Sequence, residues 1–216
     1  MRLPEKKNIN PTEIADPLKF YYLPISSGFY KKRLDMVGSM IQNNKYARLL
    51  DIGCGSGIFL KELETKCKNL YAMDIHRKMH LVKSMIDKEK INAYLYEGSI
   101  THLPFDSEVF NCIISVSVIE HVSDLDRAFS EINRVAQKNA IIVLGFPVKN
   151  VITDTIFKIS YKLLPNAKLE EEHVSNHIEI ISAAKQRYKN IEMSYFPAFF
   201  PLSFSAYCTM KIVKRE

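Results

Sequence analysis

The sequence lacks the features that mark membrane-spanning, secreted and metal-cluster proteins. No stretch supplies the ~20 apolar residues that a membrane-spanning helix requires. The charged start, MRLPEKKNINPTE, contains no apolar run of the kind that a secretory signal carries. The cysteines are scattered without a paired metal spacing, at Cys54, Cys67, Cys112 and Cys208. We therefore expect reduced thiols, no metal site and a cytoplasmic location.

The composition is that of an ordinary globular protein. The chain has 216 residues, of which 47% are hydrophobic and 25% charged. This length fits one domain, with an extension at one end. We expect residues 1–46 to form an N-terminal leader with a cap helix. Residues 47–216 would form the main domain, with an insertion at about 148–177.

Positive charge is concentrated at the two ends of the chain. Residues 1–50 carry nine Lys/Arg against four Asp/Glu, and residues 185–216 carry six against two. Such ends can contact nucleic acid or an anionic membrane surface. A solubilising surface is the favoured interpretation, because no RNA-binding motif accompanies the charge. Nucleic acid is therefore disfavoured as a partner, and peripheral membrane contact stays an open alternative.

Hydrophobic periodicity predicts strands that alternate with helices. Such alternation favours an α/β fold, with helices on both faces of a mostly parallel sheet. The expected strands lie at 47–52, 69–75, 93–96, 109–116 and 140–145, and the expected helices at 29–45, 57–66, 78–90 and 125–137. Ser123 or Asp124 is the expected N-cap of the last of these helices.

The C-terminal part breaks this alternation. Two strands at 191–199 and 205–214 follow each other without a helix between them, which predicts a hairpin with one antiparallel strand. The stretch before the hairpin is longer than one crossover helix needs. The periodicity there predicts helices at 153–164 and 178–189, with a polar loop at 166–176 between them.

A glycine loop follows the first expected strand in the segment LLDIGCGSG. Gly53, Gly55 and Gly57 allow a sharp turn and the close approach of a ligand to the backbone. The expected helix start would offer free N–H groups to an anion. The dinucleotide pattern G-x-G-x-x-G/A requires Gly or Ala where Ile58 stands, and the Gly-Lys-Ser/Thr of a phosphate-binding P-loop is absent. A ligand with an adenosine and a negatively charged group fits this loop.

Two acidic residues accompany the loop. Asp51 lies two residues before Gly53, at the end of a buried strand. A buried carboxylate needs a partner, and the ammonium of an amino-acid moiety would supply one. Asp74 ends the second expected strand, where a carboxylate can accept hydrogen bonds from ribose hydroxyls. Its alternative is an ordinary turn or cap residue.

Five segments follow one another between about residue 48 and residue 147: LLDIGCGSG, AMDIH, EGSITHLPFDSEVFNCII, SVIEHVSDLDRAFSEINRV and AIIVLGFP. In these segments and in their order, the sequence resembles the class I S-adenosylmethionine (SAM)-dependent methyltransferases, in the small-molecule-type group. The resemblance implies a Rossmann-like three-layer sandwich. Its seven-stranded sheet would have the order 3-2-1-4-5-7-6, with the last strand antiparallel.

The resemblance also implies a set of cofactor-binding residues. The expected SAM-binding residues are Asp51, Gly53, Cys54, Gly55, Gly57, Asp74, Ile75, Ser99, Ile100, Ser115 and Val116. The family usually has Asp where Ser99 stands, which weakens the expected bond to the adenine amino group. The family's Lys-Pro-Gly-Gly turn is replaced by residues 137–140, in which Asn139 is expected to take a positive φ.

The methyl acceptor is less well indicated than the cofactor. Candidate acceptor-pocket residues are Tyr21, Tyr22, Tyr30, His121 and His173. His121 could serve as a general base, although a structural histidine is favoured; Glu120 would shape the same loop. The aromatic segment YFPAFFPLSFSAY suggests a lipid-like acceptor, or equally a hairpin that packs on the sheet or on the partner of a homodimer.

The sequence therefore predicts transfer of a methyl group from SAM to an O, N or C atom of a small-molecule or lipid-like acceptor. Two alternatives remain: a nicotinamide-dependent oxidoreductase on a related fold, and a non-catalytic SAM-binding subunit. Ile58 and Asp51 argue against the oxidoreductase. A base-methylating enzyme is disfavoured because residues 115–118 lack the Asn/Asp-Pro-Pro-Tyr/Phe signature.

Overall fold

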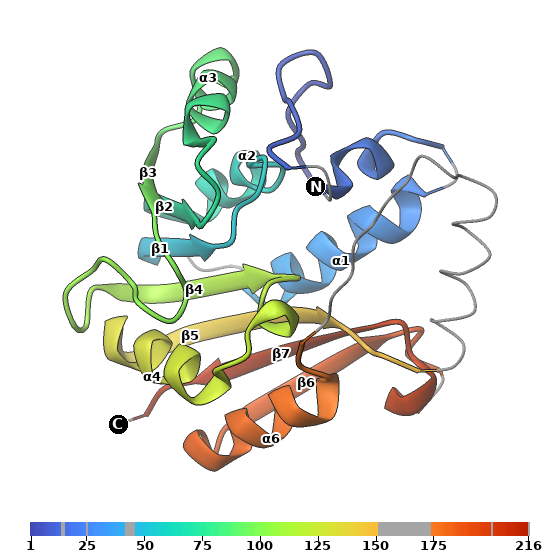
Figure 1. The fold of residues 1–216 in the computed structure, drawn as a ribbon, viewed down its shortest axis with the longest axis vertical. Coiled ribbons are helices and arrows are strands. Elements are labelled where there is room, and N and C mark those ends of the chain that lie inside the picture. Colours follow the sequence, from blue (N-terminus) through green and yellow to red (C-terminus); the bar gives the residue numbers. More distant parts are fainter. Residues whose placement is uncertain (14–15, 25, 42–45, 151–173, 200, 216) are drawn as a thin grey trace.

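A seven-stranded sheet forms the centre of the molecule (Figure 1). The computed structural model describes residues 1–13, 16–24, 26–41, 46–150, 174–199 and 201–215. The strands are β1 (Tyr46–Ile52), β2 (Cys67–Asp74), β3 (Ala93–Glu97), β4 (Phe110–Val116), β5 (Ala136–Pro147), β6 (Ile191–Phe196) and β7 (Tyr207–Val213). Their order is β3-β2-β1-β4-β5-β7-β6, and only β7 runs antiparallel to its neighbours. The predicted fold class and strand order are confirmed.

Helices cover both faces of this sheet, which gives three layers (Figure 1). On one face lie α1 (Ser27–Met40), α2 (Leu60–Leu63) and α3 (Met79–Glu89), and on the other lie α4 (Leu125–Val135) and α6 (His177–Arg187). Short 3-10 turns are η1 (Pro17–Tyr21), η2 (Glu64–Lys66), η3 (Ile119–His121) and η4 (Leu202–Phe204). Each face has its own apolar cluster, so the central strands are buried on both sides.

The alternation of side chains along β1 and β4 supplies both clusters. In β1, Leu49 packs in the cluster under α1 to α3, whereas Leu50 packs in the cluster under α4 and α6. In β4, Ile114 belongs to the first cluster and Ile113 to the second. Successive side chains of a strand point to opposite faces, so a continuous apolar run is what a doubly covered strand requires.

Two helix boundaries differ from the prediction. The helix expected at 57–66 is wrong at its start, because Gly57 has φ +82° and cannot continue a right-handed helix; α2 contains only Leu60–Leu63. The helix expected to reach residue 137 ends at Val135, and Asp124 is its N-cap. Ala136 instead enters β5 and pairs with Phe110. As a result, β5 is longer than the predicted strand at 140–145.

Other expectations are met within a few residues. Asn139 has φ +63°, as predicted. Strand β6 ends at Phe196 rather than at residue 199, and α1 begins at Ser27 and ends at Met40. A capping box formed by Asn176 and Glu179 starts α6. The predicted helix at 153–164, most of the predicted loop at 166–176 and the predicted insertion lie largely outside the described residues, and so does His173.

The last strand is tied to α4 by a buried lysine. The ammonium of Lys214, which directly follows β7, donates to the carbonyl oxygens of Asn133 at 3.0 Å and Ala136 at 2.8 Å. These carbonyls lie at the end of α4, where the helix leaves its own carbonyl groups without intrahelical partners. Lys214, near the end of the described chain, therefore supplies hydrogen bonds to the last carbonyl groups of α4, a helix from the middle of the sequence.

Candidate functional site

A cavity of about 400 Å³ lies at the carboxyl ends of β1, β2 and β4. The chain places β2 and β3 on one side of β1, and then β4 and β5 on the other side. In open α/β sheets, ligands bind at the edge where the strand order reverses in this way. The leader and α1 form the opposite wall through residues such as Thr12, Tyr21 and Arg33. Of the predicted site residues, the cavity is lined by Asp51, Gly53, Cys54, Gly55, Asp74, Ile75, Val116, Tyr21 and His121.

The three loop glycines have different roles. All three have positive φ, which favours glycine at each position. A Cβ atom on Gly53 would lie 2.1 Å from a methyl group of Val118, and one on Gly57 would lie 2.6 Å from Met85. A Cβ on Gly55 would meet nothing within 4 Å. Gly53 and Gly57 therefore serve close packing, whereas Gly55 leaves the backbone open to the cavity.

The anion site expected at the start of the following helix is not formed. Because α2 has only the four residues Leu60–Leu63, it presents no extended array of aligned N–H groups. The amides of Gly53 and Cys54 are also engaged, since both donate to the carbonyl oxygen of Met73, at 2.8 Å and 3.0 Å. These two amides are therefore not available to a negatively charged group in the cavity.

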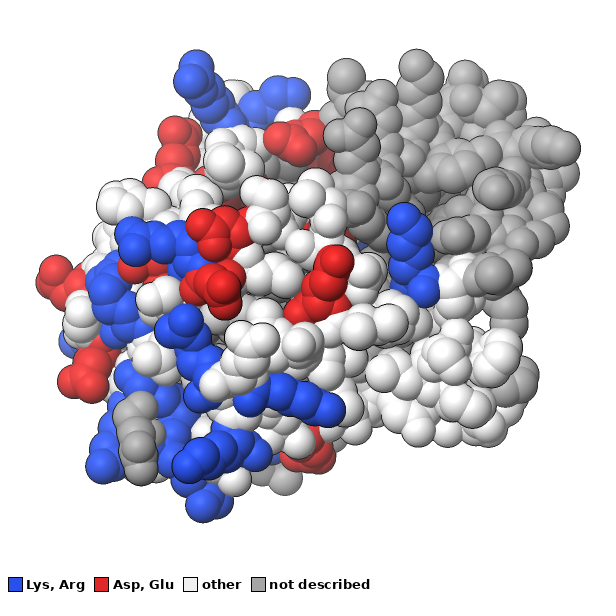
Figure 2. Space-filling view, turned by 60° about the horizontal axis from the view of Figure 1, so that its bottom comes forward, with Lys and Arg blue, Asp and Glu red and all other residues white. Residues whose placement is uncertain are grey.

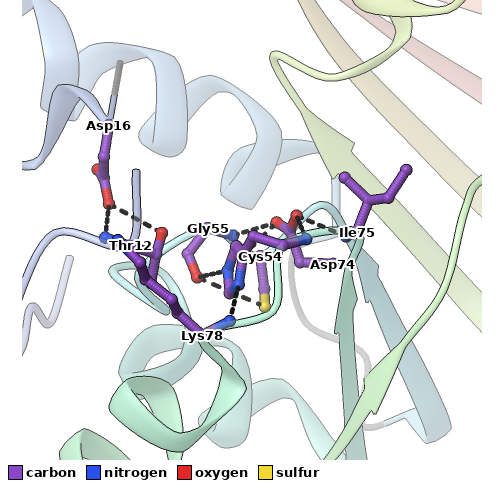
Figure 3. A network of polar contacts seen from close by, with 8 residues as sticks. Thr12, Asp16, Cys54, Gly55, Asp74, Ile75 and Lys78 are labelled. Atoms are coloured by element: carbon purple, nitrogen blue, oxygen red, sulfur yellow. Dashed lines mark hydrogen bonds and ion pairs between the residues drawn. The ribbon is translucent and has the colours of Figure 1, made fainter. Parts of the chain in front are cut away.

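Asp74 and His76 fix the loop around Gly55 (Figure 3). One carboxylate oxygen of Asp74 accepts from the N–H of Gly55 at 2.7 Å, and the other accepts from the N–H groups of Ile75 and His76. The Nδ1 atom of His76 accepts from the N–H of Lys78, so Nε2 carries the hydrogen and donates to the carbonyl oxygen of Gly55 at 2.9 Å. Both backbone polar groups of Gly55 are thus held by the end of β2.

Asp51 is a buried carboxylate that faces the cavity. Its burial, with a smaller contribution from the nearby charge of Asp74, raises its pKa to about 7. Within the part of the chain that the structure describes, its carboxylate has no hydrogen bond or ion pair. Because a charged carboxylate without a partner is unfavourable in a buried position, a cationic ligand group would be stabilised beside it.

Arg33 of α1 supplies a positive charge on the opposite wall of the cavity. Its guanidinium lies 4.3 Å from the centre of the Tyr30 ring and donates at 3.3 Å to the hydroxyl groups of Tyr21 and Ser117. Its Nε atom is buried without a hydrogen-bond partner. Among the described residues no carboxylate pairs with it. An anionic ligand group would therefore complete its environment.

Sequence reasoning missed both Arg33 and His76. A basic residue on an amphipathic helix is usually part of its solvated face, so nothing in the pattern set Arg33 apart. His76 offered a weak signal, since it lies two residues after the acid at the end of β2. Its contact with Gly55, 21 positions earlier, becomes visible only when β1 and β2 are paired.

The leader aromatics differ in their placement. Tyr21 lines the cavity, and its hydroxyl accepts a bond from Arg33. Tyr22 points away, with its hydroxyl donating to the carbonyl oxygen of Pro4 at 2.8 Å. Tyr30 packs in the core, stacked on Phe20 at 5.1 Å between ring centres. Of these three predicted acceptor residues, the structure brings only Tyr21 to the cavity wall.

Several predicted cofactor residues lie outside the cavity wall. Ser115 is buried and donates to the carbonyl oxygen of Ile52 at 3.0 Å. Ser99 bonds to Thr101 in the loop after β3, and Ile100 packs in the core beneath α4. Ile75, by contrast, lines the cavity and is 72% exposed, so an apolar face is available at the end of β2.

The loop after β3 is held by an ion pair of α4. Glu131 accepts from the N–H of Leu103, and Arg134 donates to the carbonyl oxygens of Leu103 and Phe105. Glu131 and Arg134 also pair with each other at 2.7 Å, which lowers the pKa of Glu131 to about 2. The E-x-x-R part of the resembled pattern therefore positions the loop that contains Ser99.

The strand order and the place of the cavity at the ends of β1, β2 and β4 are those of class I SAM-dependent methyltransferases. Residues 50–144 match the family model described as "Methyltransferase domain". The class recognised from the sequence motifs is thereby confirmed, and SAM is the cofactor of that class. Within the described residues, no helix is long and apolar enough to cross a membrane.

Comparison with curated proteins gives relatives with different acceptor atoms or none assigned. The chain is 33% identical over 138 residues to an uncharacterized protein of Methanocaldococcus jannaschii, covering 62% of this chain and 57% of that protein. It is 27% identical over 102 residues to the ubiquinone biosynthesis O-methyltransferase of Pelagibacter ubique, covering 47% and 42% respectively. The chain thus spans about half the length of the curated relatives it matches.

A solved structure shares the fold at low sequence identity. The N-methyltransferase NodS from Bradyrhizobium japonicum superposes with a TM-score of 0.65 at 14% identity. The superposition covers 88% of this chain and 98% of that one. At this identity the likeness concerns the fold alone.

Proposed function

We propose that this chain binds SAM in the cavity beside Gly55 and transfers its methyl group to a small-molecule or lipid-like acceptor. The observation that carries the proposal is the placement of Asp51 and Arg33 on two walls of one cavity. The amino-acid end of SAM carries an ammonium and a carboxylate. One charge of each sign on the cavity wall, both without an oppositely charged partner among the described residues, suits such a zwitterion.

The remaining contacts follow from the same orientation. Asp51 would hold the ammonium and Arg33 the carboxylate. Asp74 retains acceptor capacity on its carboxylate for ribose hydroxyls beyond its backbone bonds. Ile75 would cover one face of the adenine, and the loop with Ser99 and Ile100 would lie beyond it, as the family resemblance implies. Gly57 and Ser115 would act as packing residues of the site.

When bound, SAM supplies an activated sulfonium whose methyl group can pass directly to a nucleophile. The protein then needs to align the acceptor with the methyl group and to exclude water. Val116 and Ser117 at the end of β4, together with Tyr21, would form the walls where the acceptor enters. An acceptor hydroxyl requires a base, and His121 on the cavity wall would fill that role; a neutral amine requires none.

Calorimetry with SAM, its demethylated product and NAD tests the donor. We expect SAM and its product to bind and NAD not to bind, because Ile58 replaces the small residue of the dinucleotide pattern. Binding of NAD without SAM would establish the oxidoreductase alternative instead.

Incubation of the chain and labelled SAM with metabolite and lipid extracts tests the transfer. Label in an extract component identifies the acceptor class. SAM binding without transfer to any extract would favour the non-catalytic subunit. We further propose a cytoplasmic location, supported by four cysteines that are all free thiols.

A further inference from the structure

The hairpin end between β6 and β7 is uncharged and exposes aromatic rings. From Met193 to Met210 the sequence contains no Lys, Arg, Asp or Glu. Within this stretch Phe199 is 80% exposed and Phe204 is 52% exposed. Single exposed apolar residues are ordinary, but two exposed Phe rings in one uncharged hairpin end form an apolar surface.

Lysines flank this hairpin end on two sides. Lys32 of α1 is exposed, and its ammonium lies 5.7 Å from the centre of the Phe196 ring at the end of β6. Lys149 is also exposed and follows Val148, whose N–H donates to the carbonyl oxygen of Ala206 just before β7. Aromatic rings bordered by lysines are the composition with which proteins contact the interface of an anionic bilayer.

The same end of the hairpin is connected to the cavity. Tyr207, the first residue of β7, lies with its hydroxyl 3.1 Å from that of Ser117, and Ser117 accepts a bond from Arg33. Ser117 and Arg33 both line the cavity. A molecule that is partly embedded in a bilayer under the hairpin end would therefore be close to the wall where an acceptor enters.

The exposed area favours a bilayer over a second protein. A buried aromatic side chain contributes about 150–250 Å², so two Phe rings supply about half of the ~800 Å² per partner that a standard protein interface buries. Insertion of a few side chains into an interface has no such minimum, and neighbouring basic residues add to it. Figure 2 shows an area without charged side chains at the lower right of that view, while Lys and Arg gather at the lower left.

We propose that the hairpin end between β6 and β7 docks on an anionic lipid bilayer. Phe199 and Phe204 insert at the level of the headgroups, and Lys32 and Lys149 contact the anionic headgroups. This docking implies an acceptor with a lipid portion, a conclusion that rests on the proposed methyl transfer. The acceptor passes from the bilayer into the cavity beside Ser117 and Arg33.

Co-sedimentation with vesicles, without any methyl donor, tests the docking independently of catalysis. Wild-type protein is expected to sediment with phosphatidylcholine vesicles that contain phosphatidylglycerol, and about tenfold less with phosphatidylcholine alone. The double variant Phe199→Ser/Phe204→Ser should lower the partition coefficient about tenfold or more. Tyr94→Ser, an exposed aromatic residue on the opposite edge strand β3, is the matched control and should leave binding unchanged.

The contribution of charge is tested in the same way. Lys32→Gln/Lys149→Gln should weaken binding to the anionic vesicles, whereas Lys185→Gln/Arg187→Gln, in the last turn of α6, should not. Loss of binding in the α6 variant together with full binding in the double Phe variant would overturn the proposal. No sedimentation of the wild type, or a dimer in light scattering that only the double Phe variant dissociates, would do the same. Melting temperatures and SAM calorimetry on each variant separate these outcomes from unfolding and from failure of the proposed donor site.

Discussion

The imidazole Nε2 of His76 lies 2.9 Å from the carbonyl oxygen of Gly55, while the N–H of Gly55 donates to Asp74 at 2.7 Å. The end of β2 thus holds both polar groups of the one loop glycine that faces the cavity without packing against a side chain. A hydrogen bond of this kind contributes about 1 kcal/mol, and its loss would leave the loop free to adopt other positions.

Replacement of this histidine should weaken the binding of SAM without unfolding the domain. We expect His76→Ala to raise the dissociation constant for SAM about tenfold, since about 1.4 kcal/mol corresponds to that factor. His76→Gln, which can still present an N–H near Gly55, should recover part of the loss. His80→Ala, at an exposed position on α3, is the control for calorimetry. Equal losses for His76→Gln and His76→Ala would argue against the donor role of Nε2.

Removal of the charge at Asp51 should stabilise the ligand-free protein and impair its binding of SAM. The pKa of Asp51 is about 7 in the folded protein and 3.8 in its ordinary state, so its contribution to stability is complete below pH 4 and is lost as the pH rises through 7. Asp51→Asn should therefore melt several degrees higher than wild type at pH 8, with little difference at pH 4.5. A difference independent of pH would contradict this assignment.

Binding of SAM itself should depend on pH for the same reason. An ammonium beside Asp51 requires the ionised carboxylate, whose pKa is about 7 without ligand. The affinity of wild-type protein should accordingly fall about tenfold from pH 8 to pH 6, whereas that of Asp51→Asn should be weak and nearly flat. Calorimetry over this range distinguishes the two, and a flat wild-type profile would exclude Asp51 as the ammonium ligand.

An analogue of SAM that lacks the carboxylate can show whether Arg33 binds that group or only packs in the cavity wall. Arg33→Met preserves most of the side-chain volume but removes the guanidinium that faces the cavity. It should weaken the binding of SAM by about tenfold to a hundredfold, as expected for loss of a charge-assisted bond, and leave decarboxylated SAM almost unaffected. Lys31→Met on the same helix is the matched control. Equal weakening of both ligands would show that Arg33 supports the wall and does not contact the carboxylate.

Two of the loop glycines, Gly55 and Gly57, should respond differently to alanine. Gly57→Ala places a methyl group 2.6 Å from Met85 and should lower the melting temperature clearly, as expected when overpacking costs about 1–3 kcal/mol. Gly55→Ala meets no neighbour, so only its φ of +53° costs stability, by about 1 kcal/mol. It should instead reduce the affinity for SAM, because the new methyl group occupies the ligand side. Thermal melting and calorimetry on both variants check this contrast.

The sheet could be predicted because its central strands carry unambiguous apolar runs. Leu49, Leu50, Ile113 and Ile114 are all fully buried, since helices cover both faces of β1 and β4. The helix after the glycine loop was placed too early because Gly57 fits a helical spacing yet takes a left-handed conformation. Single-residue conformations of this kind arise from tertiary packing and leave little trace in periodicity.

The site could be predicted only in part. Asp51 and Asp74 lie at the ends of β1 and β2, and the glycines follow β1, so local sequence already indicates a ligand edge there. Arg33 belongs to a helix that precedes the first strand and reaches the cavity only through the packing of α1 against Tyr30, Tyr21 and Ser117. The family resemblance implied the strand order. Local sequence reasoning did not predict the contacts that bring Arg33 to the cavity.

The position of β7 between β5 and β6 has a consequence during synthesis on the ribosome. Strand β6 precedes β7 in the chain, yet it is hydrogen-bonded only to β7 within the described sheet. A nascent chain that has emerged as far as Phe196 can therefore form at most the five strands β1 to β5, and it still lacks the strand that joins β6 to β5. Strand β6 can join the sheet only together with Tyr207–Val213 or after it, although β6 is made first.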